Sequence, residues 1–340
     1  MPDLRVALGS LTLSNPVLVA AGTFGYGVEF AKALRLDQLG AVITKTLTRQ
    51  PRQGNPPPRL VETPSGMLNA VGLQNIGVDA FLNEKLPALR TCRVPVIVSV
   101  LGESSDEVAA MVQQLDGAEG VAAVELNLSC PNIRHRSGLR TPRPASSDRR
   151  GGQGSGPESS AHSPEPPAQS PQPMMVAQDA EATFAMDQTA SRQTRKPLIA
   201  KLSPDVTDLA PIAQAAERAG ASALSLVNTF VGMSLDPATR RSRLGTMTGG
   251  LSGPAIRPLA VYRVWYTAQT VRIPVIGIGG IVRSQDAVEF FLAGASAVAV
   301  GTANFADPSA PLRVLRGLKH YLQHGGFSSV QELRGALNQR

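Results

Sequence analysis

The sequence predicts a (β/α)8 TIM barrel, a closed sheet of eight parallel strands surrounded by helices. Short apolar runs rich in β-branched residues recur eight times, and segments of helical periodicity separate most of them. Such runs, bounded by Gly, Pro or Asn and lacking polar alternation, are typical of strands buried on both faces of a parallel sheet. Alternation of strand and helix indicates the barrel. The runs cover residues 17–21, 41–45, 96–100, 123–128, 198–202, 223–227, 275–278 and 297–300.

Helical patterns occupy residues 105–115, 209–219, 253–270 and 284–293, between the later strands. Two segments lie outside the alternation. Residues 4–13, with a turn at Gly9 and Ser10, predict a hairpin that closes the bottom of the barrel. Residues 46–95 contain too many Pro and Gly residues for one helix, so we expect an elaborate loop above the barrel, followed by a helix near 78–89. Loops of this length usually carry function.

Residues 136–173 differ in composition from the rest of the chain. Ser, Pro, Gly, Arg and Gln dominate this span, and Leu139 is its only large aliphatic residue. Too little apolar surface is available to offset the entropy of ordering, so we expect a disordered insert. The rest of the chain is about the size of one barrel with additions, so residues 1–340 are interpreted as one domain interrupted by this insert.

Composition limits the classes of function. The net charge is +7, but no long run of Lys and Arg forms a nucleic-acid patch. Cys92 and Cys130 cannot build a disulfide framework, which favours a cytoplasmic protein. No signal peptide and no apolar stretch of membrane-spanning length is found. His320 and His324 share a helix face without a third ligand, so we expect no metal site.

The polar residues that end the eight runs are the candidate site, because barrel enzymes place their active sites at the carboxyl ends of the strands. Burying Lys or Asn without partners is costly, so their concerted placement here favours function over simple strand termination. These residues are Gly22, Thr23, Lys45, Thr46, Ser99, Asn127, Ser129, Cys130, Lys201, Asn228, Thr229, Gly279, Gly280, Gly301 and Thr302.

The glycines after the last two strands indicate a phosphorylated cofactor. Barrels commonly bind phosphate at this place through exposed backbone N–H groups. Tight turns alone are the alternative interpretation. Cys130, just after the fourth run, is the candidate base, because a thiol with an ordinary pKa near 8.5 needs only modest help from positive charge to act near neutral pH. Lys45 or Lys201 could supply that charge. Cys92 precedes a strand and is interpreted as structural.

Four motifs resemble those of dihydroorotate dehydrogenases, and in particular the catalytic subunit of class 1B. The likeness extends from about residue 4 to residue 336, apart from the insert. A cysteine base is similar to class 1, and the Gly-Leu-Gln-Asn loop is similar to class 1B. The motifs are Asn69-Ala70-Val71-Gly72-Leu73-Gln74-Asn75, Asn127-Leu128-Ser129-Cys130-Pro131-Asn132, Lys201-Leu202-Ser203-Pro204 and Gly249-Gly250-Leu251-Ser252-Gly253-Pro254.

The resemblance implies oxidation of dihydroorotate to orotate in pyrimidine (UMP) biosynthesis. Cys130 removes the C5 proton, and the C6 hydride passes to FMN. Lys201 lies beside the flavin and stabilises its reduced anion. The implied substrate-binding residues are Lys45, Asn69, Ala70, Val71, Gly72, Leu73, Asn127, Asn228 and Thr229. The implied cofactor-binding residues are Ala21, Lys45, Thr46, Ser99, Asn127, Lys201, Val227, Gly253, Gly279, Gly280, Gly301 and Thr302.

The resemblance also implies a partner, an electron-transfer subunit with FAD and a 2Fe-2S cluster that reduces NAD, in a homodimer or a heterotetramer. Ser99 and Ala21 depart from the family pattern, which usually has asparagine and serine there, so we expect two flavin hydrogen bonds to be replaced or lost. Two alternatives stay open. One is another FMN barrel, such as a tRNA dihydrouridine synthase, and the other is a catalytically impaired barrel that acts as a binding scaffold.

Overall fold

A closed barrel of eight strands forms the centre of the molecule in a computed structural model that describes residues 1–129 and 175–338. Neighbouring strands pair in parallel all the way round. Each strand lies within two residues of its predicted bounds, which confirms the predicted barrel. The strands are β3 (Val17–Val19), β4 (Ala41–Ile43), β7 (Val96–Val100), β8 (Val121–Asn127), β9 (Leu198–Lys201), β10 (Ala223–Leu226), β15 (Val275–Ile278) and β16 (Ala297–Val300).

Burial on both faces explains why the sequence of these strands is almost continuously apolar. Every residue of β7, β9, β10, β15 and β16 is buried, so each strand packs inward against the barrel core and outward against helices. Cys130 and the insert predicted at 136–173 lie outside the described residues.

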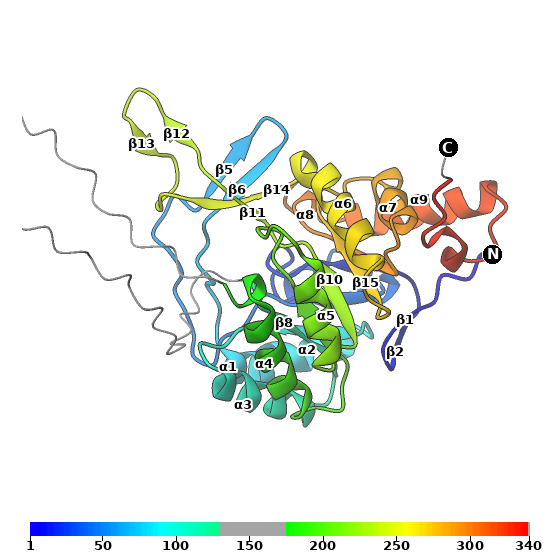
Figure 1. The fold of residues 1–340 in the computed structure, drawn as a ribbon, viewed down its shortest axis with the longest axis horizontal. Helices are drawn as coiled ribbons and strands as arrows, with labels where there is room; N and C mark the ends of the chain where they lie inside the picture. Colours follow the sequence, from blue (N-terminus) through cyan, green and yellow to red (C-terminus); the bar gives the residue numbers. More distant parts are fainter. Residues whose placement is uncertain (130–174, 339–340) are drawn as a thin grey trace, which may run out of the picture.

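Helices cover the outside of the barrel (Figure 1). Ser104 caps the first long helix by accepting a hydrogen bond from the amide of Glu107 at 3.2 Å. None of the helices in residues 1–129 and 175–338 has the length and apolar character needed to cross a membrane. The helices are α1 (Val78–Ala80), α2 (Leu86–Thr91), α3 (Ser105–Asp116), α4 (Ala180–Ser191), α5 (Ala210–Arg218), α6 (Arg257–Ala268), α7 (Ser284–Leu292), α8 (Ala303–Ala306) and α9 (Ala310–His324).

Two predicted helices are less regular than expected. The helix expected near 78–89 is interrupted by a π-helical turn, Phe81–Lys85, between α1 and α2. The helix expected over 253–270 starts with a 3-10 turn, Pro254–Ile256, before α6 begins. Gly253 itself has a φ of 93°, outside the helical region, so the chain turns sharply there before Pro254 initiates the helix.

A hairpin of β1 (Val6–Leu8) and β2 (Leu11–Leu13) closes the lower end of the barrel, as the sequence predicted. Leu8 and Leu13 are fully buried in the main hydrophobic cluster. The turn lies against the start of β10, because a Cβ added to Gly9 would lie 2.7 Å from the Cβ of Ser222. This closure leaves the opposite, carboxyl-terminal end as the open mouth.

A second sheet lies beyond the mouth and was not predicted. Its four antiparallel strands have the order β11-β14-β6-β5, and the short β12–β13 hairpin continues from β11 (Figure 1). These strands come from the segments after β4 and β10, so the sheet lies over the carboxyl ends of the barrel strands. The strands are β5 (Leu60–Thr63), β6 (Gly66–Asn69), β11 (Phe230–Gly232), β12 (Leu235–Asp236), β13 (Arg241–Ser242) and β14 (Gly249–Ser252).

Candidate active site

A cavity of about 480 Å³ lies between the mouth of the barrel and the second sheet, a size suited to a small substrate or cofactor. It gathers residues from all eight strand ends except that of β7. Ser99 on β7 does not line it, and Cys130 lies outside the described residues. The predicted residues that line the cavity are Ala21, Gly22, Thr23, Lys45, Thr46, Asn69, Ala70, Val71, Gly72, Leu73, Asn127, Ser129, Lys201, Val227, Asn228, Thr229, Gly253, Gly279, Gly280, Gly301 and Thr302.

A chain of side-chain hydrogen bonds crosses the barrel mouth. The hydroxyl of Ser99 bonds to that of Thr46 at 3.0 Å, and Asn127 Nδ2 donates to Thr46 Oγ1 at 3.2 Å. Ser129 Oγ donates to Asn127 Oδ1 at 3.1 Å and accepts from Asn228 Nδ2 at 2.6 Å. These bonds fix the orientation of both amide groups before any ligand arrives. Ser99 therefore reaches the cavity only through Thr46.

The loop after β6 forms the roof of the cavity. Asn69 Nδ2 donates to the carbonyl of Gly250 on β14 at 3.1 Å, which ties the loop to the second sheet. Gly72 and Leu73 have φ values of 71° and 59°, a left-handed conformation that is unusual for leucine. A Cβ on Gly72 would lie 2.5 Å from Asn55 Cγ, so no larger residue fits there. The loop is held in one strained shape by its surroundings.

The opposite end of the cavity is built from glycine backbone. Gly280 has a φ of 70°, and a Cβ there would lie 2.7 Å from the Cβ of Arg257 and 2.9 Å from the carbonyl oxygen of Gly253. Only glycine allows this close approach. Thr302 Oγ1 donates to Ser252 Oγ at 2.8 Å, which joins the end of β16 to β14. Exposed backbone in a narrow glycine cradle is the arrangement that binds phosphate in barrels.

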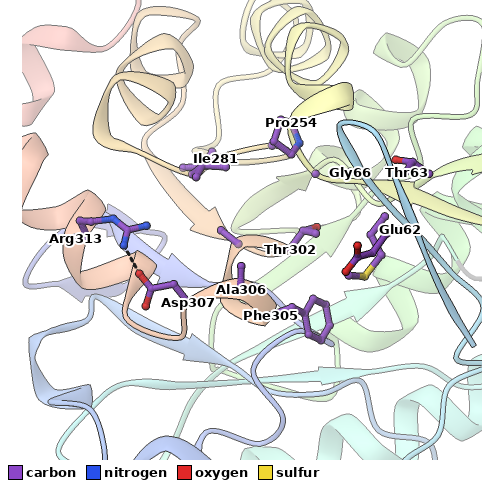
Figure 2. A pocket seen from close by; sticks show the side chains of 15 residues that line it. Glu62, Thr63, Gly66, Pro254, Ile281, Thr302, Phe305, Ala306, Asp307 and Arg313 are labelled. Atoms are coloured by element: carbon purple, nitrogen blue, oxygen red, sulfur yellow. Dashed lines mark hydrogen bonds and ion pairs between the residues drawn. The ribbon is translucent and has the colours of Figure 1, made fainter.

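A smaller cavity of about 360 Å³ adjoins this end, and both cavities include Gly280 and Thr302 (Figure 2). Figure 2 shows Arg313 pointing toward Asp307, with which it forms an ion pair. The hydroxyl and amide of Ser309, followed by Arg313, hold the pKa of Asp307 below its usual value. The charge of Arg313 is therefore offset, and an anion at this end would meet mainly backbone N–H groups.

Two charged side chains reach the main cavity from β9 and the loop after it. Lys201 is only 5% exposed and pairs in register with Asn127 on β8. Asp205 lines the same cavity, and its carboxylate accepts a hydrogen bond from the Val231 amide at 3.2 Å. Burial raises the pKa of Asp205. Lys45, from the end of β4, is a further cation of the lining.

Several lining residues lie outside the strand ends and the family motifs, so the sequence did not predict them. They come from the second sheet and the loop before β14, from α8, from the turns before α4 and α6, and from the loops after β4 and β9. The segments that carry them are too short to show a periodic pattern, so the sequence gives no signal for these residues. Asn55 is an exception in part, because it lies in the Pro-rich loop that was expected to be functional. These residues are Asn55, Leu60, Met67, Met175, Asp205, Val231, Thr246, Thr248, Ile256 and Phe305.

Comparison with known proteins agrees with this architecture. The family model described as dihydroorotate dehydrogenase matches residues 3–147 and 163–322. A protein of Geotalea uraniireducens named dihydroorotate dehydrogenase B (NAD(+)), catalytic subunit, is 47% identical over 336 residues, which cover 99% of this chain and 98% of that protein. A protein of the same name from Geobacter sulfurreducens is 46% identical over the same shares of both chains. The chain therefore belongs to the dihydroorotate dehydrogenase family.

Proposed function

We propose that this chain oxidises dihydroorotate to orotate in pyrimidine biosynthesis, with FMN bound in the main cavity and Cys130 as the base. One observation carries the proposal: a single cavity joins a glycine cradle at one end to a row of oriented amides at the other. The names of the relatives, which specify dihydroorotate and NAD, support it.

The residues of the cradle fit a flavin mononucleotide. The phosphate would lie against the glycine backbone, where Gly280 admits no Cβ, and Thr302 would contribute its amide. Lys201 would place a fixed positive charge beside the ring system, and Asn127 and Thr46 would contact its polar edge. When bound, FMN supplies the acceptor for a hydride. Ala21, Lys45, Val227, Gly253, Gly279 and Gly301 complete the proposed cofactor-binding set, and Ser99 would act on the cofactor only through its hydrogen bond to Thr46.

The side-chain amides of Asn69, Asn127 and Asn228 would bind the substrate. A pyrimidine ring presents donors and acceptors around its edge, and asparagine side chains offer one of each. Asn127 and Asn228 are pre-oriented by their bonds to Ser129, and Asn69 by its bond to β14. Lys45 would attract the carboxylate of the substrate. The strained loop 69–73 and Thr229 would contribute backbone and hydroxyl contacts.

Proton removal is assigned to Cys130. Its thiolate takes the proton from C5, the hydride leaves C6, and the C5–C6 double bond of orotate forms. The positive charges of Lys45 and Lys201 at the cavity favour the thiolate. Ser129, the residue before it, is buried and bonded to both Asn127 and Asn228, so the segment leading to the base is anchored to the site.

The electrons then leave through a partner. The relatives are named as catalytic subunits, which implies a second subunit. We propose that this partner carries FAD and a 2Fe-2S cluster and reduces NAD, and that this chain forms a homodimer or a heterotetramer with the partner. The small number of cysteines favours a cytoplasmic location.

Anaerobic absorption spectroscopy of the purified chain tests the proposal. We expect a flavin band that dihydroorotate bleaches within seconds, and a Cys130→Ala variant that keeps the band but loses rapid bleaching near neutral pH. Cys92→Ala is the matched control and should behave as the unmodified chain. A flavin band that ignores dihydroorotate would contradict the substrate assignment. A chain that binds no flavin after reconstitution would favour a binding scaffold.

A further inference from the structure

Glu125 is a buried acid with no assigned role. It lies in the middle of β8, its side chain is fully buried, and neither carboxylate oxygen has a hydrogen-bond partner among the described residues. An isolated buried carboxylate is strongly unfavourable, so a group of this kind requires a compensating interaction.

The register of the barrel shows where Glu125 points. Side chains alternate along a strand, so Glu125 faces the same side as Asn127, two residues further on, which lines the cavity. Glu125 therefore lies inside the barrel, one layer beneath the cavity. On β9, Ile199 pairs with Glu125 and Lys201 pairs with Asn127. Lys201 is thus the diagonal neighbour of Glu125, at a separation that long side chains can span.

Few charged side chains are buried in this layer and the one above it. Lys201 and Glu125 are the buried charged residues on the barrel strands within the described part of the chain, because the other two, Asp187 and Asp286, lie on helices. The residues paired with them are neutral: Ser99 pairs with Glu125 in its layer, and Ser225 pairs with Lys201 in the layer above.

Two other titratable side chains lie closer to the mouth of the barrel. Lys45 and Asp205 line the cavity above this layer. Lys201 and Glu125 form no direct ion pair with each other or with another described residue. Any attraction between them therefore acts over more than ion-pair contact distance, through an interior that screens charges less than water does.

We propose that Glu125 is the counter-ion of Lys201, a positioning residue beneath the site that holds the lysine in place at the cavity. This deepens the proposed function, because the charge of Lys201 is the one assigned to the flavin. The pairing itself exists without cofactor. It can therefore be tested in the apoprotein, where the outcome does not depend on what the cavity binds.

A double-mutant cycle in the apoprotein is the first test, with the unfolding equilibrium measured in urea at pH 7 for Glu125→Gln, Lys201→Met and the double variant. Each single change leaves one buried charge alone and should favour unfolding roughly a hundred-fold to a thousand-fold. If the two changes acted independently, their effects on the unfolding equilibrium constant would multiply. We expect the constant of the double variant to be at least about ten-fold smaller than this product. A double variant whose unfolding equilibrium constant equals this product would overturn the proposal.

A matched control uses Ser225→Ala, since Ser225 flanks Lys201 in the same layer and is neutral. Its cycle with Glu125→Gln should show coupling within about two-fold of unity. If Glu125→Gln alone does not fold, the Glu125→Gln, Lys201→Met double variant must fold. Failure of both to fold would count against a charge pair.

The second test concerns FMN. The ratio of the dissociation constants of oxidised and reduced FMN measures how strongly the site favours the reduced anion. Glu125→Gln and Lys201→Met should lower this ratio by a similar factor of about ten, equivalent to about 30 mV for a two-electron couple, and the double variant should lower it no further. A ratio that rises or stays constant in Glu125→Gln would overturn the role. A chain that binds no FMN would refute the proposed function and leave the apoprotein cycle to decide the pairing.

Discussion

The two ends of the main cavity are built from different parts of the chain. At one end the contacts come from glycine backbone after β15 and β16, in a cradle where Gly280 admits no Cβ. At the other end they come from asparagine side chains that hydrogen bonds hold in place, such as Asn127 and Asn228. Backbone N–H groups suit an anion of any origin, whereas oriented amides distinguish one ring edge from another. We therefore propose that the glycine cradle supplies affinity for the cofactor and that the asparagine side chains supply specificity for the substrate.

The largest expected effect is at the glycine end. Gly280→Val requires a left-handed backbone from a β-branched residue and a contact of 2.7 Å with Arg257, so the backbone must move. We expect FMN affinity, measured by fluorescence titration, to fall roughly a thousand-fold, the loss of two charge-assisted hydrogen bonds of about 2 kcal/mol each. Gly117→Val is the control, because Gly117 has an ordinary φ and open surroundings after α3. FMN affinity unchanged by Gly280→Val would refute the cradle.

A substitution at the asparagine end of the cavity should weaken the reaction with the substrate and leave the affinity for the cofactor unchanged. Asn228→Ala removes a proposed contact with the substrate ring, one of the two hydrogen bonds of Ser129 Oγ, and the side-chain partner of the Thr229 amide. We expect kcat/KM for dihydroorotate to fall about a hundred-fold, from about 2–3 kcal/mol of lost interaction, with FMN affinity within about two-fold of normal. If FMN affinity falls as far as kcat/KM, the two ends are not separate in function.

The roof loop gives a smaller effect of the same kind. Gly72→Ala places a Cβ against Asn55 and keeps a left-handed φ that costs alanine about 1 kcal/mol or more. Steady-state kinetics should show a KM for dihydroorotate about ten-fold higher, with kcat less affected. Gly326→Ala, also at positive φ but with nothing near its Cβ, controls for backbone strain alone. If Gly72→Ala and Gly326→Ala have the same KM for dihydroorotate, the loop has no role in substrate binding.

The smallest expected effect is electrostatic. Burial raises the pKa of Asp205, so its neutral form persists to a higher pH than in an ordinary aspartate. As pH rises through this raised pKa, the carboxylate forms in the cavity lining and repels the anionic substrate. We expect KM to rise roughly two-fold to three-fold over that interval in the unmodified chain and to stay flat in Asp205→Asn. The exposed Asp208, which binds Tyr266 outside the cavity lining, gives the control Asp208→Asn. Identical pH profiles for Asp205→Asn and the unmodified chain would contradict this role.

The barrel and most of the lining of the main cavity could be predicted because their signals are local. Eight apolar runs mark the strands, and the fold then brings the residues after each run to one end without further information. The second sheet could not be predicted, because its short strands pair across long distances in the chain, as Asn69 does with Gly250. Asp205 and Met175 were missed for the same reason.

Ser99 and Glu125 show a second limit. Both stand within runs interpreted as buried strands, and the pattern does not reveal where a polar side chain inside such a run points. Ser99 turns its hydroxyl to Thr46, and Glu125 lies beneath the cavity. Their environments depend on the register between neighbouring strands, which follows from the closed barrel and not from any one segment.

A crystal structure of the chain with FMN and orotate tests the two-ended cavity most directly. The account predicts the FMN phosphate against the backbone of Gly280 and Thr302, and the orotate ring edge within hydrogen-bond distance of Asn69, Asn127 and Asn228. A phosphate bound elsewhere, or an orotate ring that contacts none of the three asparagines, would contradict it.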